Sequence, residues 1–199
     1  MDLCTYHSHC NFCDGKAPAE DFVRAAIEAG FHSYGISSHS PLPFETRWSL
    51  RKGNVEAYLM ELKRLQEKYA GQIELYVGME IDYLNDDWGP AVEYFQRMPL
   101  DYRIGSVHLV TEEQTGEIMD MDGKFEDFRE NLRMVFRDDL KYLVEAYFKA
   151  SSRMVELGGF DFVAHLDKIS MNGSLMDSTL TKQEWYNRLL WDYMSLIAE

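Results

Sequence analysis

Two histidines stand one residue apart near the start of the chain, His7 and His9 in the segment YHSHCNFCDG. On an extended strand, side chains two positions apart project from the same face, so this pair can grip one metal ion. Asp14 ends the same segment. A CDG sequence suits a turn, and a carboxylate this close to two histidines also qualifies as a metal ligand, so both interpretations of Asp14 remain open.

Four more polar residues fall in or just after separate apolar runs: His39, Glu80, His108 and His165. A single buried histidine is usually a hydrogen-bonded core residue, so His108 or His165 alone would be weak evidence for a metal. A carboxylate inside an apolar strand is different, because Glu80 must find a cation or several donors to offset its desolvation. Together these placements predict a metal site, since separate structural explanations would otherwise have to coincide.

The elements that must position these residues alternate in type along the chain. Short apolar runs predict strands at 3–9, 33–39, 73–84, 102–110 and 160–167, and periodic segments predict helices at 18–30, 54–71, 91–98, 128–158 and 181–199. Asn54 and the Thr181/Glu184 pair read as helix caps. This order indicates an α/β fold with parallel strands, whose carboxyl ends converge on one face of a barrel. His32, at the opposite end of its strand from His39, is expected to be structural.

Composition limits the classes of protein that fit. The 199 residues are 46% hydrophobic, which suits one packed domain spanning residues 1–199. With 34 acidic against 20 basic residues the net charge is −14, and no basic run suggests nucleic-acid binding. No apolar stretch predicts a membrane span or a signal peptide, so we expect a cytoplasmic protein.

The three cysteines, Cys4, Cys10 and Cys13, form a poor disulfide framework, which fits a reducing compartment. Cys10 and Cys13 make a Cys-x-x-Cys pair that could be a redox dithiol or half of a zinc site. A structural Cys₄ site needs a second pair, which the sequence lacks. We therefore expect no direct role for the cysteines.

Five segments, HSHC, SSHSPLPFE, GMEIDY, GSVH and AHLD, occur in an order and spacing that resemble the PHP (polymerase and histidinol phosphatase) family, in particular its histidinol-phosphatase branch. The resemblance implies a distorted (β/α)7 PHP-type barrel with two to three divalent ions, usually zinc, manganese or iron. His7 and His9 would hold one ion and Glu80 would bridge two. His39, His108 and His165 would complete the others, with Asp14 near the cluster.

The reaction implied by the resemblance is hydrolysis of a phosphate monoester, with L-histidinol phosphate of histidine biosynthesis as the usual substrate. Clustered cations would supply a metal-bridging hydroxide and neutralise the phosphoryl oxygens, so no Cys or Ser nucleophile is needed. The expected phosphate-binding residues are Lys168, Arg47 and Arg153. Alternatives are a PHP phosphoesterase acting on another phosphorylated small molecule or on phosphotyrosine, and a metal-binding remnant with weakened catalysis.

The sequence departs from the family pattern at its end. Members of this branch carry an Asp-x-His on a last strand, whereas no histidine follows His165 here. We therefore expect a C-terminally truncated, incomplete barrel of about five βα units with weaker metal occupancy. Unpaired strand edges would then favour a homo-oligomer or a strand swap that covers the opening.

Overall fold

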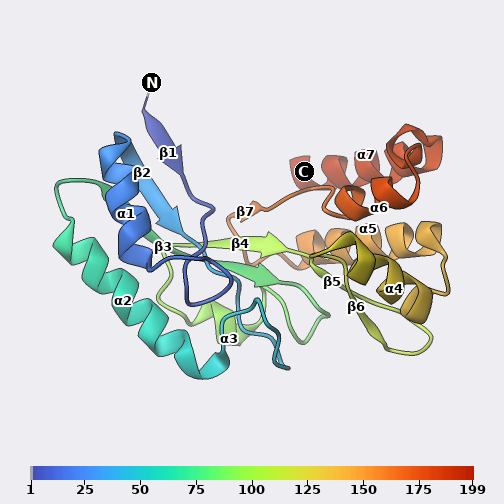
Figure 1. Cartoon of the computed structure of the whole chain (residues 1–199), viewed down its shortest axis with the longest axis horizontal. Helices are drawn as coiled ribbons and strands as arrows, with labels where there is room; N and C mark the ends of the chain where they lie inside the picture. The colour runs from blue at the N-terminus through green and yellow to red at the C-terminus, as the bar shows by residue number, and fades with distance from the viewer. Residues whose placement is uncertain (1) are drawn as a thin grey trace. The chain divides into compact units, whose positions relative to one another are not determined.

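The structure is a computed structural model that describes residues 2–199. Its sheet has five strands in the order β1-β2-β3-β4-β7, and the pairs β1/β2 and β2/β3 are parallel (Figure 1). The strands are β1 (Leu3–Thr5), β2 (Phe31–Ile36), β3 (Glu74–Asp82), β4 (Tyr102–Ser106) and β7 (Phe162–Val163). The α/β class expected from the alternation of elements is confirmed.

The helices are α1 (Ala19–Glu28), α2 (Val55–Lys68), α3 (Glu93–Gln96), α4 (Phe125–Phe136), α5 (Leu140–Leu157), α6 (Ile169–Met176) and α7 (Glu184–Ala198), with short 3₁₀ turns at Lys52–Asn54 and Leu180–Lys182. Within residues 2–199, no helix is long and apolar enough to cross a membrane.

The chain divides into two compact units, each described separately. Unit 1 comprises Met1–Ile81, Glu93–Ile104 and Gly159–Phe162, and unit 2 comprises Asp82–Val92, Gly105–Gly158 and Val163–Glu199. The prediction of a single domain is not tested by this division, because a compact unit is not by itself an independently folding domain.

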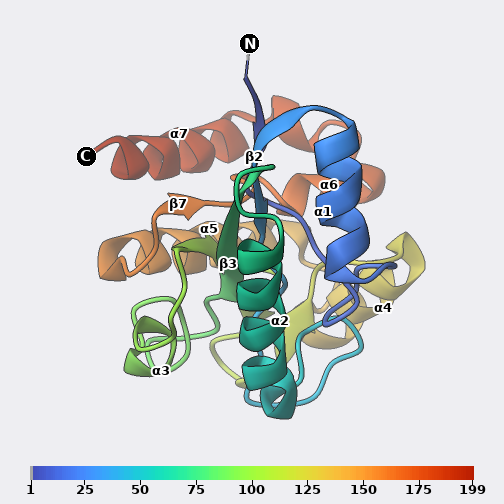
Figure 2. The ribbon, with the colours of Figure 1, turned by 90° about the vertical axis from the view of Figure 1, so that its left-hand side faces the viewer.

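In unit 1, α1 and α2 lie side by side and their apolar faces are buried (Figure 2). Buried Val23 and Ala26 of α1 and Leu62 and Leu65 of α2 keep the spacing expected from the sequence. The fully buried Tyr58 of α2 fixes the strands beneath. Its hydroxyl donates to the Gly78 carbonyl on β3 at 2.7 Å and accepts from the Ser38 N–H, just past β2, at 3.2 Å. The helix thereby ties the end of β2, close to His39, to the middle of β3.

Tyr102 performs a similar function on β4. Its ring packs where Gly35 and Gly78 leave space on β2 and β3, and a Cβ added at Gly78 would lie 2.6 Å from Tyr102 Cε1. Its hydroxyl donates to the Tyr6 carbonyl at 2.5 Å. The absence of side chains at two glycines therefore lets one tyrosine fix the segment that leads into His7.

Unit 2 contains a feature that the sequence analysis missed. The predicted strand at 102–110 is two strands, because β5 (Leu109–Thr111) leaves the sheet and pairs antiparallel with β6 (Ile118–Asp120). The carboxylate of Glu112, 1% exposed, accepts from the N–H groups of Gln114 and Thr115 at 3.0 and 2.7 Å and shapes the turn. Residues 112–117 thus form the tip of a hairpin.

Other predicted boundaries were wrong for local reasons. The helical segment 128–158 is two helices, since Arg137 and Asp138 adopt left-handed backbone angles (φ 55° and 63°) between α4 and α5. The strand predicted at 160–167 shrinks to two residues, and α6 lies beyond it. Neither Asn54 nor Thr181 caps a helix: the residues before α2 and α7 make no side-chain cap, and α7 begins after Gln183.

The Tyr102 contact predicts that Gly78→Ala destabilises the fold. The new methyl group overlaps the Tyr102 ring, and overpacking of this kind costs about 1–3 kcal/mol. The urea midpoint of unfolding measures the change. Gly53→Ala is the matched control, because an added Cβ there meets nothing within 4 Å. Equal midpoints for the two variants would contradict the role assigned to Tyr102.

A carboxylate between α1 and α2 predicts a pH effect on stability. Glu20 accepts hydrogen bonds from Lys68, from Arg64 at 2.6 Å and from the Tyr69 hydroxyl at 2.8 Å, and these donors lower its pKa from 4.5 to about 2. Because the folded pKa is depressed, the stabilisation is present above pH 4.5 and is lost as the pH falls through 2.

Glu20→Gln should therefore lower the urea midpoint near pH 6, and the gap to the wild type should narrow as the pH falls from 4.5 toward 2. Glu28→Gln, on the exposed face of the same helix, should leave the midpoint unchanged at every pH. A gap for Glu20→Gln that stays constant with pH would show that the carboxylate charge is not the cause.

Candidate metal centre

The centre of the ligand group in unit 1 is the carboxylate of Glu80, which is 1% exposed. Three imidazoles surround its Oε2 atom: His7 Nε2 at 3.2 Å, His9 Nε2 at 3.2 Å and His39 Nδ1 at 3.1 Å. A buried carboxylate needs compensating positive charge or donors, and imidazole nitrogens at this spacing can share a cation with it. The three predicted histidines and Glu80 are therefore brought together in one place.

Backbone pairing positions His39 beside Glu80. The ladder between β2 and β3 continues past Ile36 as an isolated bridge between these two residues. The Ser40 N–H donates to the Glu80 carbonyl at 2.7 Å, and the Glu80 N–H donates to the Ser38 carbonyl at 3.1 Å. His39 thus follows its strand, as the sequence analysis expected.

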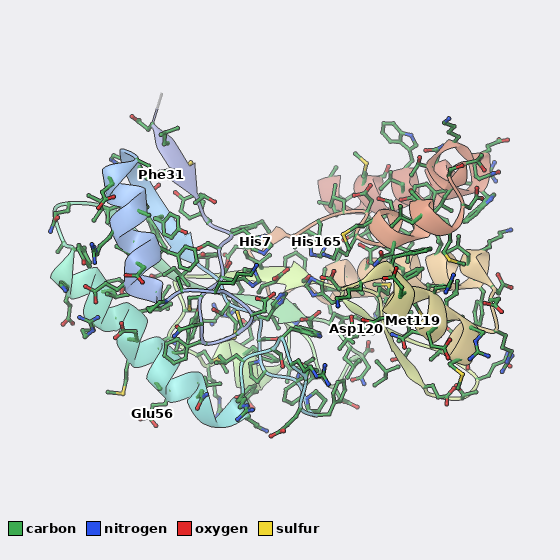
Figure 3. All side chains as sticks on the ribbon, viewed as in Figure 1. His7, Phe31, Glu56, Met119, Asp120 and His165 are labelled. Atoms are coloured by element: carbon green, nitrogen blue, oxygen red, sulfur yellow. The ribbon has the colours of Figure 1, made fainter. Side chains whose placement is uncertain are left out.

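His7 and His9 reach the same carboxylate from irregular backbone. Strand β1 ends at Thr5, so the prediction that both histidines lie on a strand was wrong. The segment is held instead by the Ser37 N–H, which donates to the Ser8 carbonyl at 2.8 Å, and by the Ser8 hydroxyl, which donates to the Gly35 carbonyl at 2.8 Å. Figure 3 labels His7 on this stretch just after β1. His7 and His9 still face the same carboxylate, because the hydrogen bonds of Ser8 to β2 and to Ser37 just past it fix the backbone between them.

A tight turn brings Asp14 to the other side of His9. The N–H groups of Cys13 and Gly15 both donate to the Cys10 carbonyl, at 3.0 and 3.1 Å. His9 Nδ1 then lies 3.1 Å from Asp14 Oδ1, and Asp14 Oδ2 lies 4.0 Å from His39 Nε2. The sequence allowed two roles for Asp14, a turn residue or a metal ligand, and the structure is compatible with both.

Cys13 also faces His9, with its Sγ atom 3.6 Å from Nδ1. Burial opposes a charge on this imidazole, yet the hydrogen bonds to Cys13 and Glu80 raise the pKa of His9 to about 10. Burial likewise opposes a thiolate at Cys13, but the hydrogen bond from His9 lowers the pKa of that thiol. Acceptors on both ring nitrogens of His9 thus favour positive charge at this point.

The ligand group of unit 2 is built around Asp82, which is completely buried. Asp82 Oδ1 accepts from both the backbone N–H of His108 at 3.0 Å and its Nδ1 at 2.8 Å. When Nδ1–H donates to a carboxylate, the Nε2 lone pair is available for a metal, an arrangement common around histidine ligands. His108 itself is 2% exposed.

His165 faces that lone pair. It lies just after β7, as Figure 3 shows, and its Nε2 atom is 3.0 Å from His108 Nε2. Two nitrogens that share a tetrahedral zinc ion at about 2.0–2.1 Å lie about 3.3 Å apart, so the pair has nearly the required spacing. The hydroxyl of Tyr147, on α5, donates to the carbonyls of His165 and Leu166 at 3.4 and 3.3 Å and holds this segment.

The basic residues proposed for phosphate differ in their surroundings. Lys168 forms an ion pair with Asp122 at 2.8 Å, and although burial opposes a charge there, Lys168 keeps the pKa of Asp122 below its usual range. Arg153 binds Asp86 at 2.6 Å and Glu156 at 3.1 Å. Arg47 lies in the loop between β2 and α2 and lines an open cavity.

Two residues of the site were missed or set aside by the sequence analysis. Asp82 follows Glu80 by two positions, the same spacing that singled out His7 and His9, and this signal could have identified it. Cys13 was assigned no direct role, and no sequence pattern places its thiol against His9. His32, by contrast, is exposed, lies 3.9 Å from Glu74 and belongs to neither ligand group among the described residues.

Comparisons with known proteins agree with this picture. A family model described as PHP domain matches residues 5–199. The chain is 26% identical over 174 residues to a Deinococcus radiodurans protein named probable histidinol-phosphatase, which covers 83% of this chain and 60% of that protein. It is 27% identical over 135 residues to the histidinol-phosphatase of Bacillus subtilis, with coverage of 58% and 47%. The chain thus spans about half the length of these relatives.

A solved structure shares the fold. The crystal structure of a proposed histidinol phosphatase, hisK, from Listeria monocytogenes superposes with a TM-score of 0.77 at 22% identity, covering 98% of this chain and 79% of that one. The resemblance seen in HSHC, SSHSPLPFE, GMEIDY, GSVH and AHLD is confirmed by the family match over nearly the whole sequence. The chain belongs to the PHP domain family.

Proposed function

We propose that the chain is a metal-dependent phosphoric monoester hydrolase whose substrate is L-histidinol phosphate. The observation that carries the proposal is the buried Glu80 carboxylate with three imidazole nitrogens at 3.1–3.2 Å from one of its oxygens. The names of the curated relatives support the choice of substrate.

The donor set fits divalent ions. Imidazole and carboxylate ligands accommodate zinc, iron and manganese, and the groups His7/His9/Glu80 and His9/Asp14/His39 each have donor atoms within 4.8 Å of one another. We assign His7, His9, Asp14, His39 and Glu80 of unit 1, together with His108 and His165 of unit 2, as ligands of two to three ions. Bound ions of this kind lower the pKa of water and neutralise phosphoryl oxygens.

The remaining residues of the site orient ligands or bind substrate. Asp82 accepts a hydrogen bond from His108 Nδ1 and thereby fixes the direction of His108 Nε2. Lys168, Arg47 and Arg153 are proposed to bind the phosphate. Lys168 and Arg153 already have carboxylate partners, so their contact with phosphate would require an exchange of partner, whereas Arg47 would not.

Replacing Glu80 tests the proposal directly. Glu80→Gln keeps the size of the side chain but removes the charge that holds the imidazole cluster together. We expect metal content, measured by plasma mass spectrometry, to fall by at least one ion per chain. Phosphate release from L-histidinol phosphate should fall by about 100-fold or more, because electrostatic stabilisation of phosphoryl transfer is the largest catalytic contribution.

His32→Ala is the matched control, since this histidine is exposed and outside both ligand groups. It should keep the metal content and turnover of the wild type. Metal without turnover in the wild type would indicate a binding protein rather than an enzyme. No metal in the wild type would overturn the proposal as a whole.

Asp82 gives a second test. Asp82→Asn keeps the shape but removes the charged acceptor of the His108 Nδ1 proton, and loss of such an acceptor lowers metal affinity by about 10–100-fold. Titration of the metal-depleted chain with zinc measures the affinity. Asp87→Asn, in the exposed turn after β3, is the control. Unchanged zinc affinity in Asp82→Asn would mean that His108 is not a ligand.

A further inference from the structure

A further group of metal-binding atoms lies at the ring nitrogen of His9 that does not face Glu80. It consists of the Cys13 thiol, the Asp14 carboxylate and His9 Nδ1. Cys13 Sγ lies 3.6 Å from His9 Nδ1 and 3.5 Å from Asp14 Oδ1, and the last two atoms are 3.1 Å apart. A sulfur, a nitrogen and an oxygen atom from three side chains thus lie within 3.6 Å of one another.

These separations are close to those of a tetrahedral zinc site. Zinc binds sulfur at about 2.3 Å and imidazole nitrogen or carboxylate oxygen at about 2.0–2.2 Å, so its ligand atoms lie about 3.3–3.7 Å apart. Both distances from Cys13 Sγ fall in this range, and the distance between His9 Nδ1 and Asp14 Oδ1 is slightly shorter. The three side chains can therefore bind one ion after only small movements.

The hydrogen bonding of His9 makes the required nitrogen available. His9 Nε2 lies 3.2 Å from Oε2 of the buried Glu80. When Nε2–H donates to this carboxylate, the Nδ1 lone pair is available for a metal. Glu80 then orients His9 as Asp82 orients His108, with the two ring nitrogens exchanged, and it keeps His7 and His39 as neighbours on its own side.

A tight turn holds the sulfur and the carboxylate in place beside His9. The N–H groups of Cys13 and Gly15 share the Cys10 carbonyl as acceptor. A Cβ added at Gly15 would lie 2.5 Å from the Cys10 backbone, so only glycine allows the chain to close this tightly. A backbone that is fixed before the ion binds lowers the entropic cost of binding it.

The three cysteines have different surroundings. Cys10 is completely buried, and its Sγ atom lies 3.3 Å from the Ser38 hydroxyl oxygen. Cys4 is exposed on β1. Cys13 is partly exposed and lines an open cavity, so that an ion in solution can reach its thiol. Within residues 2–199, Cys13 is the cysteine that combines this access with imidazole and carboxylate neighbours.

We propose that Cys13, His9 and Asp14 bind a zinc ion, with Cys13 as a thiolate ligand. Thiolate is a soft ligand that favours zinc, whereas manganese and magnesium prefer oxygen ligands. The sulfur atom therefore makes this position selective for zinc. This inference rests on the proposed function, in which His9 and Asp14 are metal ligands. It adds a ligand that decides the identity of one ion, and it departs from the expectation that no cysteine has a direct role.

Cobalt(II) tests for the thiolate ligand, because it replaces zinc and gives a near-ultraviolet charge-transfer band characteristic of bound thiolate. Titration of the metal-depleted full chain with cobalt should produce this band with the intensity of one thiolate per chain. Cys13→Ser should lose the band. Cys4→Ser, the same substitution at an exposed cysteine, should retain it. No band in the wild type, or a band that survives Cys13→Ser, would overturn the proposal.

Competition between two metals separates ligation from a structural role of Cys13. Cys13→Ser should weaken zinc binding by at least about 10-fold, a loss already typical of residues that only support a ligand, and should leave manganese affinity within about twofold. Dissociation constants for each metal alone measure both effects. Equal losses for zinc and manganese would show that the substitution only disturbs the turn, and the thiolate ligand would be refuted.

A measurement on the wild type does not depend on the folding of any variant. A thiolate bound to zinc is a poor nucleophile, so zinc should protect Cys13 from alkylation by iodoacetamide, whereas manganese should not. Cys4 should react equally with either metal. Mass spectrometry of peptides locates the modified cysteine. Alkylation of Cys13 at the same rate with and without zinc would contradict the proposal.

These outcomes are distinguishable from those of the proposed reaction. A chain that shows the thiolate band but releases no phosphate from L-histidinol phosphate would refute the proposed function and keep the zinc site. A chain that hydrolyses the ester without a thiolate band would keep the function and refute the zinc site.

Discussion

The interaction on which the rest of unit 1 depends is the buried contact between Glu80 and three imidazoles. A carboxylate that is 1% exposed costs several kcal/mol to desolvate, so the surrounding structure must return that energy through positive charge or metal coordination. Tyr58 ties the end of β2 to the middle of β3, and Tyr102 ties β4 to the segment before His7. Tyr58 thus helps to position His39 and Glu80, and Tyr102 helps to position His7. The packing of the sheet therefore determines the distances between Glu80 and the imidazoles.

The two ligand groups use carboxylates in different ways. Glu80 Oε2 faces imidazole nitrogens and can share a cation with them, whereas Asp82 Oδ1 accepts hydrogen bonds from Nδ1 and from the backbone N–H of His108. Glu80 and Asp82 lie two positions apart on β3. Their contacts differ because Glu80 is surrounded by three imidazoles, whereas Asp82 faces His108. A strand that supplies both a ligand and the residue that orients another ligand explains why two acids can be tolerated inside an apolar run.

The sequence predicted which polar side chains come together better than it predicted the bounds of the helices and strands that carry them. Candidate ligands can be chosen from side-chain type and spacing, and the structure places ligand atoms of the chosen His7 and His39 within 3.2 Å of Glu80 Oε2. The ends of helices and strands, in contrast, depend on contacts with residues that are distant in the sequence. Strand β1 stops at Thr5 because its continuation is held by Ser37 and Gly35, and the helix break at Arg137 and Asp138 contains neither glycine nor proline. The turn between β5 and β6 is shaped by the carboxylate of Glu112, and its burial could not be foreseen from a charged side chain in a polar run.

The distribution of charge bears on how such a site selects its substrate. Several cations of this acidic chain form ion pairs with nearby carboxylates: Lys168 with Asp122, Arg153 with Asp86, and Lys68 with Glu20. A phosphate dianion approaching a surface of net charge −14 is repelled, and only cations held near the ligands can reverse this. The loop after His39 carries Arg47 and Arg51, neither of which forms an ion pair with a carboxylate among residues 2–199. The same loop also contacts His39, through the Trp48 ring and the Leu50 N–H.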